Sequence, residues 1–226
     1  MKCRGWPVML ALALAACGNE AAPPAAEREQ AAPALQAEVS GPERRILAFG
    51  DSLFAGYGVG ASKSYPSQLQ AALRARGINA RVTNSGVSGD TTASGLQRIE
   101  FVLDGGPRPD LVIVELGGND LLRGISPVET RENLKAILLE LQERHVPVLL
   151  MGMRAPPNLG EEYVQAFDGI YPDLANQYGA TLVPFFLEPV YDKTQLMQRD
   201  HKHPNAEGVA TIVAATVDQV AEALPD

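Results

Sequence analysis

Cysteine is nearly absent from this chain of 226 residues, and both cysteines, Cys3 and Cys17, lie close to the amino terminus. No disulfide bond or cysteine-ligated metal can therefore form in the rest of the chain. Basic residues are also outnumbered, since 19 Lys and Arg stand against 27 Asp and Glu, for a formal charge of −8. Nucleic acid binding needs a basic face, so this balance argues against nucleic acid as a partner.

The apolar run over residues 8–16 is too short to span a membrane. Lys2 and Arg4 precede it, and this combination is typical of an export signal. The run ends in Leu14-Ala15-Ala16-Cys17, which resembles the bacterial lipobox, in which the cysteine is lipidated and becomes the first residue. These residues predict a lipoprotein signal peptide over 1–17, although an ordinary signal peptide with a chance cysteine also fits them.

Residues 18–42 are rich in Ala, Pro and Glu and contain almost no large apolar side chain. This composition predicts a disordered tether of the kind that a lipid-anchored domain needs. Residues 43–226 are long enough for one domain with a sizeable core. We therefore expect one exported domain that is anchored to the bacterial envelope through Cys17 and lies in the periplasm.

Apolar runs alternate with amphipathic segments five times in this domain. Strands are expected over residues 46–49, 80–83, 110–116, 146–151 and 181–184, with a loop over 84–90. Helices are expected from Ser64, from Thr91 or Thr92, from Ser126, over 161–178 and over 206–224. The alternation predicts an α/β fold in which right-handed crossovers join five parallel strands, with helices on both faces of the sheet.

The first of these runs ends abruptly in Gly50-Asp51-Ser52, which places Ser52 at the carboxyl end of a buried strand. Ligands of open parallel sheets bind outside this edge. A serine there can act as a nucleophile if a neighbouring base takes its proton. By itself, however, it could equally be a helix cap.

The chain contains three histidines that could serve as this base. His145 should lie at the opposite edge of the sheet, as a helix-end residue. His201 and His203 precede the last helix and should share the edge of Ser52. Asp200 lies three residues before His203, so a turn would place its carboxylate beside Nδ1 and leave Nε2 to face Ser52. His201 is the weaker candidate, because in an extended segment its side chain points away from that of His203.

Acyl transfer also needs donors for the developing oxyanion, and loops at the same edge offer them. Gly89 has a backbone N–H that a substrate can approach closely, and Asn119 has a side-chain amide. The N–H of Ser52 is a third candidate. Gly89 and Asn119 could otherwise be ordinary turn residues.

Two cofactor hypotheses fit the residues less well. Asp200, His201 and His203 could ligate a metal, but no third ligand cluster is evident and Lys202 would repel a cation. The stretch from Gly56 to Ala61 fits a dinucleotide-binding fingerprint, but the acidic residue expected about 20 positions later is missing. The Gly-x-Ser-x-Gly motif of α/β-hydrolases is absent. We expect neither a metal nor a cofactor.

Four blocks of the chain, taken together, resemble the SGNH or GDSL hydrolases. They are Gly50-Asp51-Ser52-Leu53, the Gly89 of Ser88-Gly89-Asp90, Gly117-Gly118-Asn119-Asp120 and Asp200-x-x-His203-Pro204. The chain resembles most closely the bacterial branch of arylesterases, acyl thioesterases and lysophospholipases. The resemblance implies a flavodoxin-like three-layer sandwich with a five-stranded parallel sheet.

The resemblance also implies a role for each site residue. Ser52 would be the nucleophile, His203 the base, and Asp200 the group that orients His203. Ser52 N–H, Gly89 N–H and Asn119 would be the oxyanion donors.

The expected function is hydrolysis of aryl or acyl esters, with thioesters and lysophospholipids as further substrates. The acyl pocket is expected between residues 154–163 and the pair Phe185 and Phe186. The expected partners are a small ester substrate and, through Cys17, the membrane, with no obligate protein partner. Two alternatives remain open, namely a carbohydrate acetylesterase of the same family and a lipid-anchored binding protein without catalysis.

Overall fold

The computed structural model of the protein describes residues 39–225. The predicted signal peptide, Cys17 and nearly all of the predicted tether lie outside these residues. Within the described range, no helix combines the length and the hydropathy that a membrane span requires.

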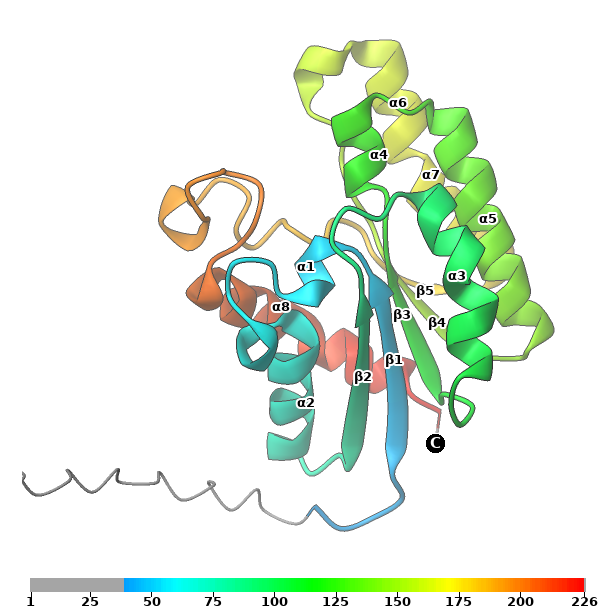
Figure 1. Ribbon diagram of the computed structural model, residues 1–226, viewed down its shortest axis with the longest axis vertical. Coiled ribbons are helices and arrows are strands. Elements are labelled where there is room, and N and C mark those ends of the chain that lie inside the picture. The colour runs from blue at the N-terminus through cyan, green and yellow to red at the C-terminus, as the bar shows by residue number, and fades with distance from the viewer. Residues whose placement is uncertain (1–38, 226) are drawn as a thin grey trace, which may run out of the picture. The chain divides into compact units, whose positions relative to one another are not determined.

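A five-stranded parallel sheet in the order β2-β1-β3-β4-β5 forms the centre of the domain (Figure 1). Its strands are β1 (Arg44–Gly50), β2 (Ala80–Gly86), β3 (Leu111–Glu115), β4 (Val148–Met151) and β5 (Thr181–Val183). This order is the flavodoxin-like one, and it confirms the expected α/β fold.

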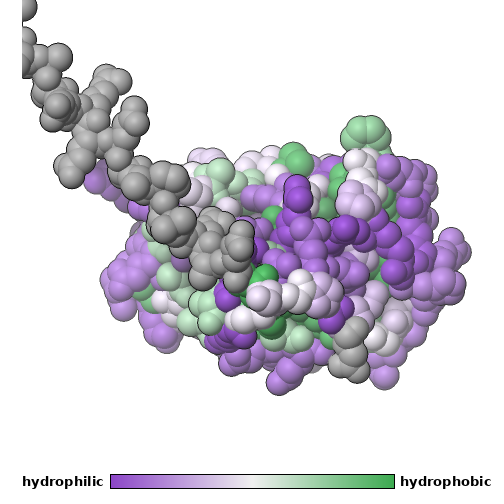
Figure 2. Space-filling model, turned by 90° about the horizontal axis from the view of Figure 1, so that it is seen from below, coloured by the Kyte–Doolittle hydropathy of each residue, from purple (hydrophilic) through white to green (hydrophobic). Residues whose placement is uncertain are grey.

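Helices cover both faces of the sheet. The helices are α1 (Ser52–Ala55), α2 (Tyr65–Ala75), α3 (Thr92–Asp104), α4 (Gly118–Arg123), α5 (Pro127–Glu143), α6 (Glu161–Asp168), α7 (Ile170–Tyr178) and α8 (Ala206–Ala223), with short 3₁₀ turns at Ala61–Lys63, Pro157–Leu159 and Thr194–Leu196. Figure 1 shows α2 and α8 on one face and α3, α5 and α7 on the other, and each group packs together. The surface below the amino edge of the sheet is mostly hydrophilic with scattered apolar areas (Figure 2).

Local sequence signals place the helix starts where they were expected. The Thr91 and Ser126 hydroxyls accept hydrogen bonds from the backbone N–H groups of Ser94 and Glu129, respectively, as N-caps do. Asn205 caps α8 in the same way, so the helix starts at Ala206, as expected. Pro204 lies before the helix and forms an isolated β-bridge with Met197.

Most predicted boundaries agree with the structure to within two residues, but two elements differ by more, each for a physical reason. The predicted loop at 84–90 starts later, because β2 continues to Gly86 and pairs with the end of β1 in spite of its polar side chains. The helix predicted over 161–178 is two helices that meet at Gly169. Pro172 has no N–H for the carbonyl four residues earlier, and its ring clashes with that carbonyl, so one continuous helix cannot form.

Gly86 at the end of β2 makes the closest backbone approach to the loop that follows β1. A Cβ atom on Gly86 would lie 2.8 Å from the carbonyl oxygen of Asp51 and would also collide with the backbone nitrogen of Ala55. Both obstacles are backbone atoms, so no side-chain rotation can relieve them. We predict that Gly86→Ala lowers the free energy of unfolding in urea by roughly 1–3 kcal/mol.

Gly106→Ala is the matched control, because a Cβ atom on Gly106 meets nothing within 4 Å. Its urea midpoint should match that of the wild type. If Gly86→Ala also unfolded at the wild-type urea concentration, the close approach would not constrain the fold.

Candidate active site

Ser52 is positioned by a helix that begins directly after β1. Asp51 is the N-cap of α1, because its Oδ1 accepts the backbone N–H of Leu53 at 2.9 Å. Ser52 is therefore the first residue of the helix and not its cap. Its side chain is 9% exposed, and its hydroxyl remains available for another partner.

The structure brings Ser52, His203 and Asp200 together at the carboxyl edge of the sheet. Ser52 Oγ lies 2.8 Å from His203 Nε2, whereas the Asp51 carboxylate is at 3.5 Å, so the imidazole is the nearer acceptor. His203 Nδ1 lies 2.7 Å from Asp200 Oδ2. With the ring proton on Nδ1, the three groups form a continuous chain of hydrogen bonds from Oγ to the carboxylate.

The other carboxylate oxygen of Asp200 accepts the backbone N–H groups of Lys202 and His203, at 3.0 and 3.1 Å. Partial burial raises the pKa of Asp200. The hydrogen bonds from the His203 ring and from these two N–H groups outweigh that effect and lower the pKa to about 2. Asp200 is therefore a carboxylate at neutral pH and can orient an imidazole and stabilise its positive charge.

His203 is held in place from two sides. The Tyr57 ring lies against the imidazole, with centroids 4.5 Å apart. Gln198 Nε2 donates to the carbonyls of Tyr57 and Pro204 at 2.8 and 2.9 Å, and the Gln198 N–H donates to the His203 carbonyl at 2.7 Å. A Cβ atom on Gly58 would collide with the Gln198 side chain. The glycine-rich stretch that fitted a nucleotide motif thus packs against the segment that carries His203.

The two remaining histidines take no part in this hydrogen-bond chain, although His201 lines the same cavity as Ser52. His201 has a backbone φ of 55° and its side chain is exposed, in the turn between Asp200 and Lys202. His145 follows α5, and its carbonyl accepts a hydrogen bond from Arg108. It lies before β4, at the opposite edge of the sheet.

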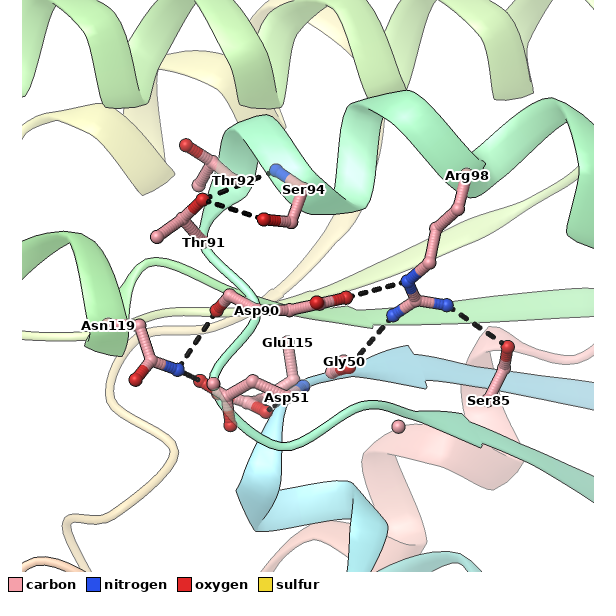
Figure 3. A network of polar contacts seen from close by, with 12 residues as sticks. Gly50, Asp51, Ser85, Asp90, Thr91, Thr92, Ser94, Arg98, Glu115 and Asn119 are labelled. Carbon is pink, nitrogen blue, oxygen red and sulfur yellow. Dashed lines mark hydrogen bonds and ion pairs between the residues drawn. The ribbon is translucent and has the colours of Figure 1, made fainter.

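The three candidate oxyanion donors differ in how they are engaged. Asn119 Nδ2 donates to Asp51 Oδ2 and to the carbonyl of Asp90, both at 2.9 Å, so both of its hydrogens are in use (Figure 3). Gly89 has a φ of 88°, and its carbonyl accepts a hydrogen bond from Arg123. Within residues 39–225, the N–H groups of Ser52 and Gly89 have no hydrogen-bond partner.

Arg98 of α3 supports the loop that carries Asp90. It pairs with the Asp90 carboxylate at 2.6 Å, donates to the Gly50 carbonyl at 3.0 Å and to Ser85 Oγ at 3.2 Å, and lies 3.9 Å above the Phe49 ring (Figure 3). The sequence analysis did not identify Arg98. The sequence shows only a cation beside the apolar Ile99 of the expected helix, which does not distinguish Arg98 from a surface residue.

Ser52 and His203 face a cavity of about 390 Å³. The side chains that line it are mostly apolar, and they include Leu53, Leu121, Leu122, Met153, Pro156, Leu159, Phe185, Leu187, Tyr191 and Met197. Asn119, Arg154 and Lys202 add polar groups to this lining. A second hollow of about 410 Å³ lies at the amino edge of the sheet, but no serine or histidine lines it.

The expected walls of the acyl pocket were partly right. Arg154, Pro156, Leu159 and Phe185 line the cavity. Phe186 does not, because it is buried in the core against Phe54 and Tyr65. The leucines of α4 were missed because this helix was not predicted after Gly117-Gly118-Asn119-Asp120.

Known proteins resemble the chain in sequence and in structure. The model of the GDSL-like Lipase/Acylhydrolase family matches residues 48–210. An arylesterase of Vibrio mimicus is 43% identical over 163 residues, which are 72% of this chain and 81% of that protein. The thioesterase 1/protease 1/lysophospholipase L1 of Escherichia coli strain K12 is also 43% identical, over 162 residues that are 72% of this chain and 76% of that one.

The crystal structure of AlinE4, an SGNH-hydrolase family esterase, matches with a TM-score of 0.70 and 65% identity, covering 83% of this chain and 100% of that one. The chain therefore belongs to the GDSL-like lipase/acylhydrolase family, the SGNH hydrolases, and is an ester hydrolase.

Proposed function

We propose that the protein hydrolyses aryl and short- to medium-chain acyl esters, and lysophospholipids, through an acyl-enzyme on Ser52. The observation that carries this proposal is the hydrogen-bond chain from Ser52 through His203 to Asp200 beside an apolar cavity. A nucleophile, a base and a group that orients the base are what acyl transfer to a serine requires.

In the first half of the reaction, Ser52 Oγ attacks the carbonyl carbon of the ester while His203 Nε2 takes the hydroxyl proton. Asp200 stays ionised and stabilises the imidazolium that forms. The tetrahedral intermediate collapses when Nε2 returns the proton to the leaving alcohol or phenol. In the second half, Nε2 takes a proton from water, the water attacks the acyl-enzyme, and the acid leaves.

The N–H groups of Ser52 and Gly89 and the amide of Asn119 receive the oxyanion in this mechanism. The first two are unengaged in the described structure, but Asn119 must redirect one hydrogen. Its bond to Asp51 is charge-assisted, whereas its bond to Asp90 ends on a neutral carbonyl. Charge-assisted hydrogen bonds are roughly twice as strong as neutral ones. The amide hydrogen that Asn119 donates to the Asp90 carbonyl is therefore the one that turns to the oxyanion.

The cavity lining favours an acyl or aryl group over a sugar, because its leucines, Met153 and Phe185 offer few partners for hydroxyl groups. The names of the relatives, arylesterase and thioesterase 1/lysophospholipase L1, support the same choice. Arg154 and Lys202 also belong to this lining, and their positive charges suit a substrate that carries an anionic group.

The cellular location is proposed from the sequence alone. Residues 1–17 fit a lipoprotein signal peptide, and 18–42 fit a tether, so the domain would lie in the periplasm on a lipid attached to Cys17. Acyl-CoA is scarce outside the cytoplasm, which leaves esters and lysophospholipids as the favoured substrates.

Two substitutions test the catalytic roles. We predict that Ser52→Ala abolishes turnover of a p-nitrophenyl ester and labelling by a fluorophosphonate probe. We also predict that His203→Asn lowers kcat by roughly 10³-fold or more, because removing a triad base costs several orders of magnitude. His145→Asn is the control, because this histidine lies at the far edge of the sheet and asparagine tolerates its positive φ of 55°. Near-wild-type turnover by Ser52→Ala would refute the assignment.

A series of p-nitrophenyl esters of increasing acyl length tests the substrate class. We predict that kcat/KM rises from acetate to medium-chain acyl groups, because each methylene buried against the apolar lining contributes about 0.8 kcal/mol. Lysophospholipid should be hydrolysed by the same preparation. A preference for acetate over all longer chains would point instead to a carbohydrate acetylesterase.

The anchor is tested by cell fractionation. We predict that the full-length protein sediments with the membrane fraction and that Cys17→Ser moves it to the soluble fraction or leaves it unprocessed. Cys3→Ser is the matched control, because it removes the other cysteine without altering the lipobox. A Cys17→Ser protein that still sediments as the wild type does would contradict lipidation at this residue.

A further inference from the structure

Glu115 is a buried carboxyl group directly behind the nucleophile, and the mechanism above makes no use of it. It is the last residue of β3, it is 0% exposed, and its backbone register partner in β1 is Gly50. Its Oε2 accepts the Asp51 N–H at 3.3 Å, and its Oε1 has no hydrogen-bond partner among the described residues (Figure 3). Glycine is required opposite it, because a Cβ atom on Gly50 would lie 2.9 Å from Oε2.

Among the described residues, no cation pairs with the Glu115 carboxyl group. Arg98, the cation labelled in Figure 3, binds Asp90, Ser85 and the Gly50 carbonyl instead. Instead, the neighbour of Glu115 is a second carboxyl group, that of Asp51. Two buried carboxylates side by side are strongly unfavourable, so such a pair retains one proton.

The hydrogen-bond partners show which group keeps this proton. Asp51 accepts from Leu53 N–H and from Asn119 Nδ2, both at 2.9 Å, which favours its ionised form. Glu115 accepts only one long hydrogen bond. Burial and the neighbouring charge of Asp51 raise the pKa of Glu115 well above its ordinary value. Burial also raises the pKa of Asp51, but hydrogen bonds from Leu53 and Glu115 oppose this effect.

We propose that Glu115 is a positioning residue: as a neutral acid it donates a hydrogen bond to the Asp51 carboxylate and fixes the oxygens that hold α1 and Asn119. One oxygen of Asp51 caps the helix that starts at Ser52, and the other holds the amide of Asn119. Glu115 therefore sets the distance between nucleophile and oxyanion donor without touching the substrate. This inference rests on the proposed function, because it assigns Glu115 a task within the same catalytic site.

Glu115→Gln and Glu115→Leu separate positioning from simple packing. Glutamine keeps the shape, a donor for Asp51 and an acceptor for its N–H, whereas leucine keeps only the bulk. We expect Glu115→Gln to hydrolyse p-nitrophenyl esters at close to the wild-type kcat. We expect Glu115→Leu to lose roughly 10- to 100-fold in kcat with little change in KM, since small misplacements of catalytic groups cost about this much.

Val112→Ala is the control for stability, because Val112 is equally buried in β3 but lies near the other end of the strand. It should lower the urea midpoint while keeping the wild-type kcat. Equal kcat losses in Glu115→Gln and Glu115→Leu, or none in Glu115→Leu, would overturn the positioning role. Absence of ester hydrolysis or of fluorophosphonate labelling at Ser52 in the wild type would instead refute the proposed function.

The pH dependence of stability gives a second readout that does not need a folded Glu115→Leu protein. A raised pKa in the folded state means that the stabilisation is present at low pH and is lost as the pH rises from 4.5, the ordinary value, through the folded-state pKa. The unfolding free energy of the wild type, relative to Glu115→Gln, should therefore fall over this range. A constant difference would show that Glu115 holds no extra proton.

The titratable groups that face the pair do not mimic this signal. They are Tyr171 of α7 and, on the side of Asp51, His203. Burial raises the pKa of Tyr171, so this group stays neutral at the pH values used. His203 is present in both proteins.

Discussion

The site depends on one carboxylate, that of Asp51, and on the hydrogen bonds that its two oxygens accept. The chain leaves the sheet at Gly50, and the next residue must both start a helix and meet the neighbouring loop. One oxygen of Asp51 caps α1 at Leu53, and the other holds Asn119. The segments after β1 and β3 are thereby fixed to each other, although 68 residues separate Asp51 from Asn119. In the proposed mechanism, this contact defines where a substrate carbonyl can lie relative to Ser52.

The carboxyl groups of the site have different tasks because their surroundings differ. Asp200 is partly exposed and accepts hydrogen bonds from a ring nitrogen and two backbone N–H groups, so its pKa is low and it remains charged. Glu115 is fully buried beside another carboxylate, so its pKa is high. A charged orienting group and a neutral donor are thus made from the same functional group by solvation and neighbours alone.

Much of this arrangement could be predicted from the sequence, because topology brings the ends of parallel strands to one edge. Ser52 follows a buried strand, and Asp200 and His203 precede the last helix, so their meeting follows from the strand–helix alternation. The edge strand β2 was predicted too short because its last residues are polar and pair only through the backbone. Phe186 was assigned to the cavity because an apolar residue in a loop looks the same whether it faces the core or a ligand.

Arg98 and Glu115 could not have been identified by such reasoning. A cation within a helix and an acid at the end of a strand are ordinary features of solvated surfaces. Here the partners of each lie on other elements, so their burial becomes evident only once the chain is folded. These two residues matter to the site because other elements bury them, and the neighbouring residues in the sequence do not indicate this burial.

In the site without substrate, the Asn119 amide donates both of its hydrogens to protein acceptors. An oxyanion can accept one of these hydrogens only if an existing hydrogen bond breaks. The net stabilisation of the oxyanion is therefore the difference in free energy between the new hydrogen bond and the one it replaces. The neutral Asp90 carbonyl is the weaker competitor for this hydrogen, and Arg98 keeps its loop from following the amide. In the proposed mechanism, the Asn119 donor is thus preorganised by a hydrogen bond that is easily exchanged, and this favours the charged intermediate over the neutral ester.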